Sequence, residues 1–153
     1  MRSLEPWVEA PLAAFLAESG ARLTLLMTSS GQVVAQHGFL RSLDVMSAAA
    51  LGAGIMAATA ELARVMESAP LESVTHQGKA LGLYLGAFGT PRGRWIGLVV
   101  YGAETSLGLV QLFFARLVDD LGRAAPAELP PRQVLAEDFE HELNSSLRSL
   151  FGR

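Results

Sequence analysis

The longest apolar stretch of the chain covers residues 45–60, in which Ser47 and Thr59 are the only residues with polar side chains. Ala, Leu and Met dominate residues 44–66, and these residues favour the α-helix. The pattern therefore predicts a long helix over this range, with Asp44 as its N-cap. A helix that lies on a single sheet has a polar face toward water. Because this helix has almost no polar face, we expect it to need apolar cover on two sides.

Three interpretations of this helix compete: a membrane span, a fully buried core helix and an interface helix. The uninterrupted run of about sixteen residues is shorter than the roughly twenty that a bilayer span needs. Small residues let another backbone approach closely, and an exposed apolar patch usually marks an interface. They recur at four-residue spacing in two rows, Ala49, Ala53 and Ala57 in one and Ala50, Gly54 and Ala58 in the other. These rows favour an interface with a second protein, and full burial stays the alternative.

Gly52, Gly54 and Ala57 match the spacing of the dinucleotide-binding fingerprint G-x-G-x-x-A, and Glu72 follows them. That chemistry requires a strand directly before the glycines and a helix N-terminus at them, so that backbone N–H groups face the pyrophosphate. Here the glycines follow two turns of predicted helix. We therefore expect no nucleotide site in this stretch.

The rest of the pattern predicts two further helices and five strands. Amphipathic spacing predicts helices over 7–19 and 105–123, the second with Thr105 as its N-cap. Turn residues between apolar runs predict strands over 22–28, 32–37, 71–76, 80–87 and 95–101. The continuous apolar run of the last strand indicates a central strand that is buried on both faces. Hairpins join neighbouring strands, so the fold class is α+β, with the order α-β-β-α-β-β-β-α and a largely antiparallel sheet.

Prolines at 126, 130 and 131 separate the C-terminal part of the chain from the rest. We expect a domain over residues 1–124, a Pro-rich linker over 125–134 and an amphipathic tail helix over 135–153. Apolar residues of the tail fall every four positions, at Leu135, Phe139, Leu143, Leu147 and Phe151. Such a helix either packs on its own domain or docks in the groove of a partner.

Composition excludes several kinds of function. A net charge of −3 without a basic cluster argues against nucleic-acid binding, and the absence of cysteine excludes disulfides and thiolate metal sites and fits a reducing cytoplasm. No signal peptide is evident at the N-terminus. His37, His76 and His141 lack metal-site spacing, and residues 29–31 indicate a hairpin turn, not a nucleophile. We therefore expect no cofactor, no metal and no catalytic residue.

Four patches carry a family resemblance: residues 20–32, 48–58, 76–84 and 101–110. The most specific is Thr105-Ser-Leu-Gly-Leu-Val110, directly after the last predicted strand. With these patches the chain resembles the Roadblock family (dynein light chain type), and within it the bacterial MglB-like proteins. The resemblance implies a five-stranded antiparallel sheet with the long helix on one face and the other two helices on the opposite face. It also implies a homodimer built by pairing sheet edges and long helices.

The resemblance further implies that the dimer binds a small Ras-like GTPase of the MglA-like kind, in bacterial cell polarity or motility, and speeds its GTP hydrolysis. Such an activator either donates an arginine or positions the groups of its partner. Arginine candidates are Arg64, Arg92, Arg94 and Arg116, but the MglB-like resemblance points to positioning, so none is assigned a catalytic role. The expected contact surface is the exposed face of the long helix, with the tail as a second contact: Ala50, Ala53, Ala57, Glu61, Arg64, Leu143, Leu147 and Phe151. The alternative for the long-helix residues is helix packing within the dimer.

Two other functions stay open. One is a non-catalytic Roadblock scaffold that binds and localises a GTPase or another partner. The other is a small-ligand sensor, which requires a deep pocket between the sheet and the helices.

Overall fold

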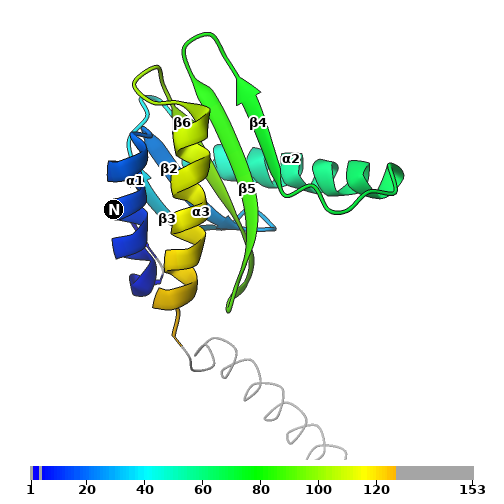
Figure 1. The fold of residues 1–153 in the computed structure, drawn as a ribbon, viewed down its shortest axis with the longest axis horizontal. Helices are drawn as coiled ribbons and strands as arrows, with labels where there is room; N and C mark the ends of the chain where they lie inside the picture. The colour runs from blue at the N-terminus through cyan, green and yellow to red at the C-terminus, as the bar shows by residue number, and fades with distance from the viewer. Residues whose placement is uncertain (1, 4, 127–153) are drawn as a thin grey trace, which may run out of the picture.

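The computed structural model describes residues 2–3 and 5–126 of the 153-residue chain (Figure 1). The predicted tail helix over 135–153 lies outside the described residues, as does all but the first two residues of the predicted linker. The elements in chain order are β1 (Arg2–Ser3), the short 3-10 helix η1 (Pro6–Val8), α1 (Glu9–Ser19), β2 (Leu23–Thr28), β3 (Val33–Gly38), α2 (Val45–Val65), β4 (Ser73–Gln77), β5 (Gly82–Thr90), β6 (Gly93–Tyr101) and α3 (Leu107–Ala124).

The strands form one antiparallel sheet in the order β1-β3-β2-β6-β5-β4. β6 lies between β2 and β5, and its last seven residues are all buried, which confirms the predicted central strand. All five predicted strands are present. The sixth, β1, was not predicted, because two residues carry no periodic pattern. It pairs Arg2 with Gln36 and Ser3 with Ala35 on the outer edge of β3.

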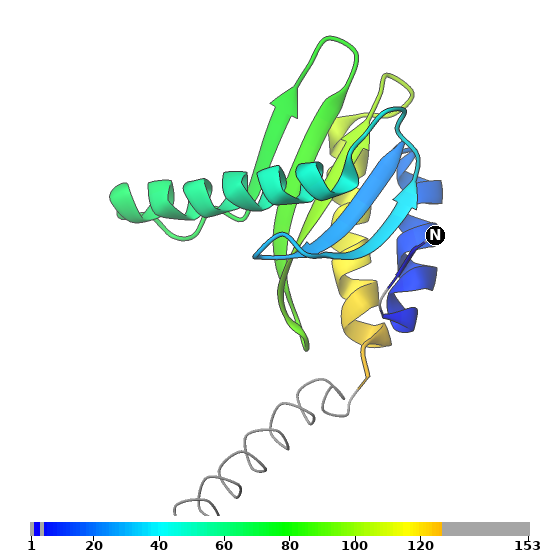
Figure 2. The ribbon, with the colours of Figure 1, turned by 180° about the vertical axis from the view of Figure 1, so that it is seen from behind.

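Figures 1 and 2 show three layers, with α2 on one face of the sheet and α1 and α3 side by side on the other. Each face has its own apolar core. The core under α1 and α3 includes Phe15, Leu26, Trp95, Phe114 and Leu117. The core under α2 includes Leu25, Met27, Met56, Leu85 and Leu98. The layering implied by the family resemblance is therefore confirmed.

Helix α3 packs against the sheet at two glycines, where no side chain separates it from the strand backbone. Gly86 of β5 and Gly97 of β6 are register partners, and the ring of Phe114 lies against both. A Cβ atom at Gly86 would stand 2.7 Å from Cε1 of Phe114, and one at Gly97 would overlap the ring. Tyr84 and Phe88 meet the same ring edge-on, at centroid distances of 5.1 and 5.7 Å. These glycines therefore let α3 approach the sheet closely.

The helix caps match the predictions in one case and differ in the other. Asp44 is the N-cap of α2 and accepts a hydrogen bond from the backbone N–H of Ser47 at 3.3 Å, as predicted. The N-cap of α3 is Ser106 and not Thr105; the Ser106 side chain accepts a hydrogen bond from the N–H of Leu109. Both residue types suit the position, so sequence did not distinguish them. The Thr105 hydroxyl instead donates to the carbonyl of Ser19 at 2.6 Å and ties α3 to the end of α1.

Candidate partner-binding surface

Helix α2 is only partly covered by its own chain. Its N-terminal half lies on the sheet, where Ala49, Gly52, Ala53 and Met56 are buried, whereas Ala63 is the single buried residue after Met56. Figures 1 and 2 show the C-terminal half extending past the edge strand β4. Full burial within the chain is therefore not the explanation of this apolar helix. Its surface is available to another molecule.

The small residues of α2 set how closely the helix approaches the sheet. A Cβ atom at Gly52 would stand 3.2 Å from Cδ1 of Leu98 and 3.5 Å from Cδ2 of Leu85. Gly31, in the β2–β3 turn, lies similarly close to the backbone of Ala50. A Cβ atom at Gly54 would meet no other atom within 4 Å. Of the two glycines in the fingerprint-like motif, Gly52 therefore allows close packing of α2 on the sheet, and Gly54 lies in open space. Neither lies at the N-terminus of a helix, as a nucleotide site would need.

One exposed stripe of α2 carries large apolar side chains. Leu51, Leu62 and Val65 are 69%, 54% and 74% exposed, and Ala58 lies between them at helical spacing. We call these four residues the outer stripe. Exposed apolar side chains gathered along one helix face are typical of a protein–protein interface. The sequence pattern marked Ala58 as part of a small-residue row but did not mark Leu51, Leu62 and Val65, although their spacing of seven, four and three residues around Ala58 carries the signal.

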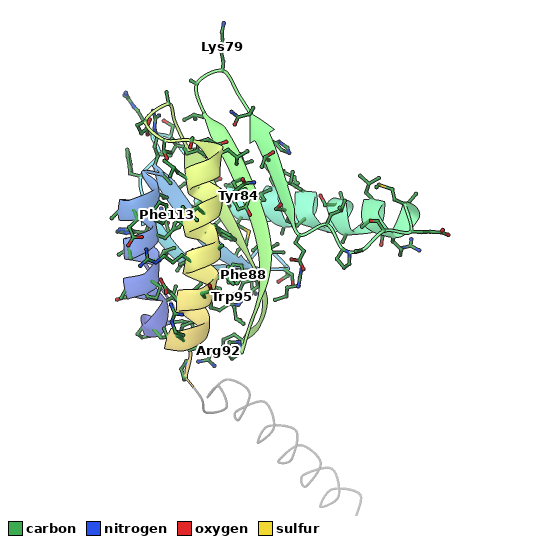
Figure 3. The ribbon with its side chains drawn as sticks, in the orientation of Figure 1. Lys79, Tyr84, Phe88, Arg92, Trp95 and Phe113 are labelled. Atoms are coloured by element: carbon green, nitrogen blue, oxygen red, sulfur yellow. The ribbon has the colours of Figure 1, made fainter. Side chains whose placement is uncertain are left out.

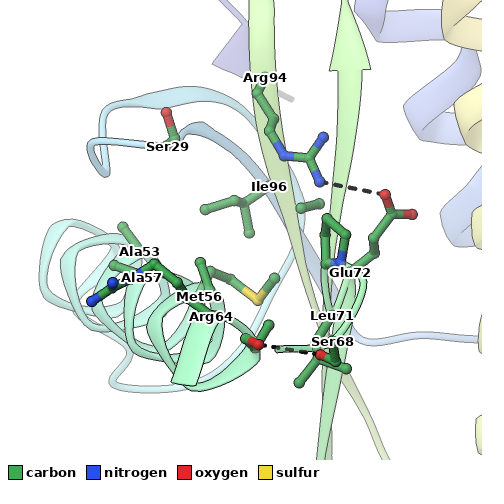
Figure 4. Close-up of a pocket in the computed structure, with 14 residues that line it drawn as sticks. Ser29, Ala53, Met56, Ala57, Arg64, Ser68, Leu71, Glu72, Arg94 and Ile96 are labelled. Carbon is green, nitrogen blue, oxygen red and sulfur yellow. Dashed lines mark hydrogen bonds and ion pairs between the residues drawn. The ribbon is translucent and has the colours of Figure 1, made fainter. Parts of the chain in front are cut away.

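A second surface is a groove of about 580 Å³ between α2 and the sheet, which we call the α2 groove (Figure 4). Its α2 wall is built mainly from small or flexible side chains, and its other walls come from the sheet, the β2–β3 turn and the connection from α2 to β4. The lining residues are Ser29, Ala53, Met56, Ala57, Ala60, Ala63, Arg64, Ser68, Pro70, Leu71, Glu72, Ala87, Arg94 and Ile96. The surface of the groove is therefore mostly apolar, with three charged residues among its lining.

The four candidate arginines are all ion-paired with carboxylates. Arg64 and Arg94 lie at the α2 groove, whereas Arg92 lies beside the C-terminal end of α3 (Figure 3) and Arg116 lies on α3 itself. The pairs are Arg64–Glu61 at 2.8 Å, Arg92–Glu5 at 2.9 Å, Arg94–Glu72 at 3.6 Å and Arg116–Glu18 at 3.2 Å. An arginine that enters a partner's nucleotide site from this chain would first have to leave its carboxylate.

The structure places four of the predicted contact residues at the surface. Ala50, Ala57, Glu61 and Arg64 are exposed on one flank of α2, and Ala57 and Arg64 of these line the groove. Ala53 is only 7% exposed, because it packs on the sheet and contributes to the groove wall. The predicted tail contacts Leu143, Leu147 and Phe151 lie outside the described residues. The sequence did not predict the wall of the groove opposite α2, because Arg94 lies on β6 and Glu72 lies just before β4.

The described residues offer two surfaces for binding, the outer stripe and the α2 groove. Over residues 2–3 and 5–126, no group of three His, Asp or Glu side chains could hold a metal ion. The groups with shifted pKa values, Arg22, Asp44, Tyr84 and Glu104, all lie outside the groove. Perturbed groups gathered in a cleft would instead have indicated reactive chemistry.

Helix α2 is also long and apolar enough to cross a membrane by length and composition, with a mean hydropathy of 1.5. Its Ala49, Ala53 and Met56 nevertheless pack with the sheet in the core on that face. This packing accounts for the buried stripe of the helix as part of a folded domain.

Comparisons with known proteins agree with this architecture. The model of the Roadblock/LC7 domain family matches residues 8–91. Among solved structures, MglB of Myxococcus xanthus is 27% identical with a TM-score of 0.69, covering 76% of this chain and 92% of that one. The gliding protein MglB of Thermus thermophilus is 31% identical with a TM-score of 0.68, covering 78% and 89%. A structure described as MglB with a tetrameric arrangement is 30% identical with a TM-score of 0.67, covering 77% and 87%. No curated protein matches the sequence.

Proposed function

Because this chain belongs to the Roadblock/LC7 family, we propose that it is a homodimeric activator of GTP hydrolysis by a small Ras-like GTPase of the MglA-like kind. Similarity to MglB at 27% and 31% identity supports a regulatory role. The observation that carries the proposal is the uncovered α2, which presents the outer stripe and the α2 groove on different sides of one helix. Two surfaces on one helix suit two partners, a second copy and the GTPase. We place this activity in the cytoplasm and in bacterial cell polarity or motility.

In this proposal the second copy covers the outer stripe and the free edge of the sheet. Among the described strands, β4 ends the sheet on one side, whereas β1 pairs along part of the other edge. Free edges favour strand pairing with another chain. Because α2 extends past β4, a second copy that pairs along β4 about a two-fold axis would lie beside the C-terminal half of α2. Leu51, Leu62 and Val65 would then lose their exposure to water.

The GTPase, in turn, contacts the groove side of α2 in this proposal. Ala50 and Ala57 allow close approach of another backbone, and Glu61 and Arg64 supply charges at the exposed end. The tail residues Leu143, Leu147 and Phe151 are proposed as a second contact with the bound GTPase. Since each candidate arginine already pairs with a carboxylate, the proposed mechanism is positioning of the GTPase's own catalytic groups. This chain would then supply no catalytic residue.

The test is single-turnover hydrolysis of GTP by the cognate Ras-like GTPase, with and without this protein. A faster release of phosphate in its presence supports the activator. Complex formation without a faster rate selects the second candidate, a scaffold that binds and localises the GTPase. The ion-paired state of all four arginines is the observation that favours this scaffold. Neither complex nor acceleration with the cognate GTPase would contradict both.

The α2 groove also has the volume of small-ligand sites, which are about 300–1,000 Å³. Such sites usually combine apolar walls with a few polar groups that converge on the ligand. Here Arg94 and Glu72 pair with each other, and Arg64 pairs with Glu61. The groove therefore fits a macromolecular contact better than the small-ligand sensor considered from the sequence.

A further inference from the structure

We propose that residues 135–153 of the same chain pack back along the outward side of α3 when no GTPase is bound. The tail would then form a third helix over the seam where α1 and α3 meet. This side of the molecule lies across the sheet from α2, on which the proposed contacts with the second copy and the GTPase are placed. Packing of the tail stands on the structure and the sequence alone, whereas its release to a bound GTPase rests on the proposed function.

The first argument is that α3 has an outward side that no other described element covers. Leu109 and Leu112 are 45% and 62% exposed, and Arg116 and Arg123 follow them on the same side at helical spacing. We call these four residues the α3 face. Figure 1 shows α1 and α3 side by side in front of the sheet, so this face points away from the strands. Neighbouring exposed leucines on one helix favour contact with another apolar surface.

The second argument is the shape of the seam beside the α3 face. A shallow hollow runs between the two helices, and its lining includes Ala14 and Glu18 of α1 and Phe113, Arg116 and Asp120 of α3. Ala14 is exposed and small, and the ring of Phe113 is only partly buried. Because the distance between packed helices depends on the side chains at the contact, a small residue here lets a third helix lie close. The seam therefore offers a seat for an apolar helix row.

The third argument is register. A row in the tail and a row on α3 have mirrored steps, four and three residues in the tail against three and four on α3. The two rows are Leu143, Leu147 and Leu150 in the tail and Leu109, Leu112 and Arg116 on α3. Both helices rise about 1.5 Å per residue, so an antiparallel tail that starts level with the end of α3 keeps the rows level. Leu147 then meets Leu112, Leu150 meets Leu109, and Leu143 reaches the aliphatic stem of Arg116.

The fourth argument is charge. The carboxylates of the tail precede this leucine row, at Glu137, Asp138, Glu140 and Glu142. In the same register they lie level with the C-terminal half of α3, where the side chains of Arg116 and Arg123 are 63% and 73% exposed. Arg116 donates through Nη1 to Glu18, and Arg123 donates through Nη2 to Asp120, so other N–H donors of both groups can bind carboxylates of the tail. Residues 107–115 of α3, level with the leucines, carry no charge.

The fifth argument is reach. Pro126, Pro130 and Pro131 prevent α3 from continuing straight into the tail helix. The linker over residues 125–134 spans up to about 33 Å when extended, whereas packed helices lie only about 8–10 Å apart. Tethering also gives the tail an effective concentration in the millimolar range for a short linker. The tail of the same chain therefore has an advantage over a free partner with a similar apolar row.

The packing has a consequence for the complex with the GTPase. Leu143 and Leu147 are also proposed to contact the bound GTPase. One leucine row cannot cover the α3 face and contact the GTPase at the same time. Formation of the complex would therefore expose Leu109 and Leu112, on the side of the molecule opposite α2.

The chain contains no cysteine, so single thiols can report on the seam in the full-length protein. The experiment measures the rate at which a maleimide modifies Ala14→Cys, at an exposed α1 position in the lining of the seam. The comparison variant adds Leu143→Ser and Leu147→Ser, which remove two members of the leucine row. We expect modification about 10-fold faster in the comparison variant. Ala50→Cys, at an exposed position of α2 across the sheet, is the matched control and should react equally fast with either tail.

Equal rates at Ala14→Cys with both tails would overturn the proposal, because the seam would then be open or covered by something other than the tail. A second measurement identifies the chain that supplies the tail. Oxidation of Leu112→Cys with Leu147→Cys should give a disulfide within one chain, whereas Ala50→Cys with Leu147→Cys should not. A disulfide that forms only between chains would contradict the same-chain occupant. Neither measurement contains a GTPase, so failure here is distinct from failure of the proposed function.

Discussion

Arg92 and Glu5 form an ion pair at 2.9 Å in which the side chains are only 17% and 21% exposed. The pair holds the segment before η1 against the β5–β6 hairpin, beside the stacked rings of Trp7 and Trp95. A charge-assisted hydrogen bond in such a place stabilises more than a solvated surface pair.

Replacing Arg92 by Ala should therefore lower the free energy of unfolding by about 1–3 kcal/mol, because Glu5 loses its charged partner. Urea denaturation measures the change. Arg116→Ala is the matched control, since the Arg116–Glu18 pair is largely exposed and should contribute less than about 1 kcal/mol. Both variants should keep the activation of GTP hydrolysis, because neither arginine lies at α2. Loss of activation with a normally folded Arg92→Ala would show that this arginine acts on the nucleotide.

A charge placed on the outer stripe should weaken the proposed dimer. Leu62→Asp places a carboxylate in the proposed apolar contact, where an unpaired charge is costly to desolvate, and should shift the protein from dimer to monomer. Sedimentation velocity measures the distribution. Leu112→Asp on α3 is the control, because Leu112 is similarly exposed, at 62% against 54%. If Leu62→Asp remains a dimer at the same concentration, the outer stripe is not the dimer surface.

Two glycines should respond oppositely to alanine. Gly54 lies in α2 with open space around it, so Gly54→Ala should raise the free energy of unfolding by up to about 1 kcal/mol through helix propensity. The ring of Phe114 packs directly against Gly97, so Gly97→Ala should lower the free energy of unfolding by about 1–3 kcal/mol through overpacking. Urea denaturation at one pH compares the two. A stabilised Gly97→Ala would mean that α3 does not lie against β6 as described.

Glu104 should give the domain a measurable acid sensitivity. The side chain of Arg22 donates a hydrogen bond to its carboxylate at 2.7 Å, and this bond lowers the pKa of Glu104 below the ordinary value of 4.5. A lowered folded-state pKa stabilises the fold above pH 4.5, and this contribution disappears as the pH falls through the lower value. The melting temperature of the wild type should therefore exceed that of Glu104→Gln at about pH 7, and the two should converge on acidification below the ordinary pKa of the carboxyl. A difference that grows on acidification would contradict this assignment.

Sequence periodicity predicted most of the fold because helices and strands of this domain are long enough to show their apolar faces. It also placed Asp44 at the start of α2, where a carboxylate directly before the apolar run could cap the helix. It predicted Thr105 as the cap of α3 where the structure has Ser106, since both residue types suit the position and the Thr105 hydroxyl instead bonds the carbonyl of Ser19. It could not predict β1, since Arg2 and Ser3 gain their strand geometry from the edge of β3 alone.

The sequence predicted α2 as the candidate surface but did not predict which of its residues are exposed. The pattern marked α2 as short of polar residues, but a helical wheel does not reveal where the helix leaves the sheet. That departure separates Ala53, which is packed on the sheet, from Ala57, which is exposed four residues later. The groove depends in addition on Arg94 and Glu72, which come from distant parts of the sequence. Only the three-dimensional arrangement joins them to α2.

The most direct measurement of the central claim is single-turnover GTP hydrolysis by the cognate GTPase in the presence of three proteins: the wild type, Ala57→Arg and Ala115→Arg. Ala57→Arg puts a long cation into the apolar groove wall, whereas Ala115→Arg makes the same change on an exposed position of α3. The wild type and Ala115→Arg should each accelerate hydrolysis by about tenfold or more, and Ala57→Arg should not. Equal acceleration by all three proteins, or none by the wild type, would contradict the assignment of the α2 groove as the GTPase-binding and activating surface.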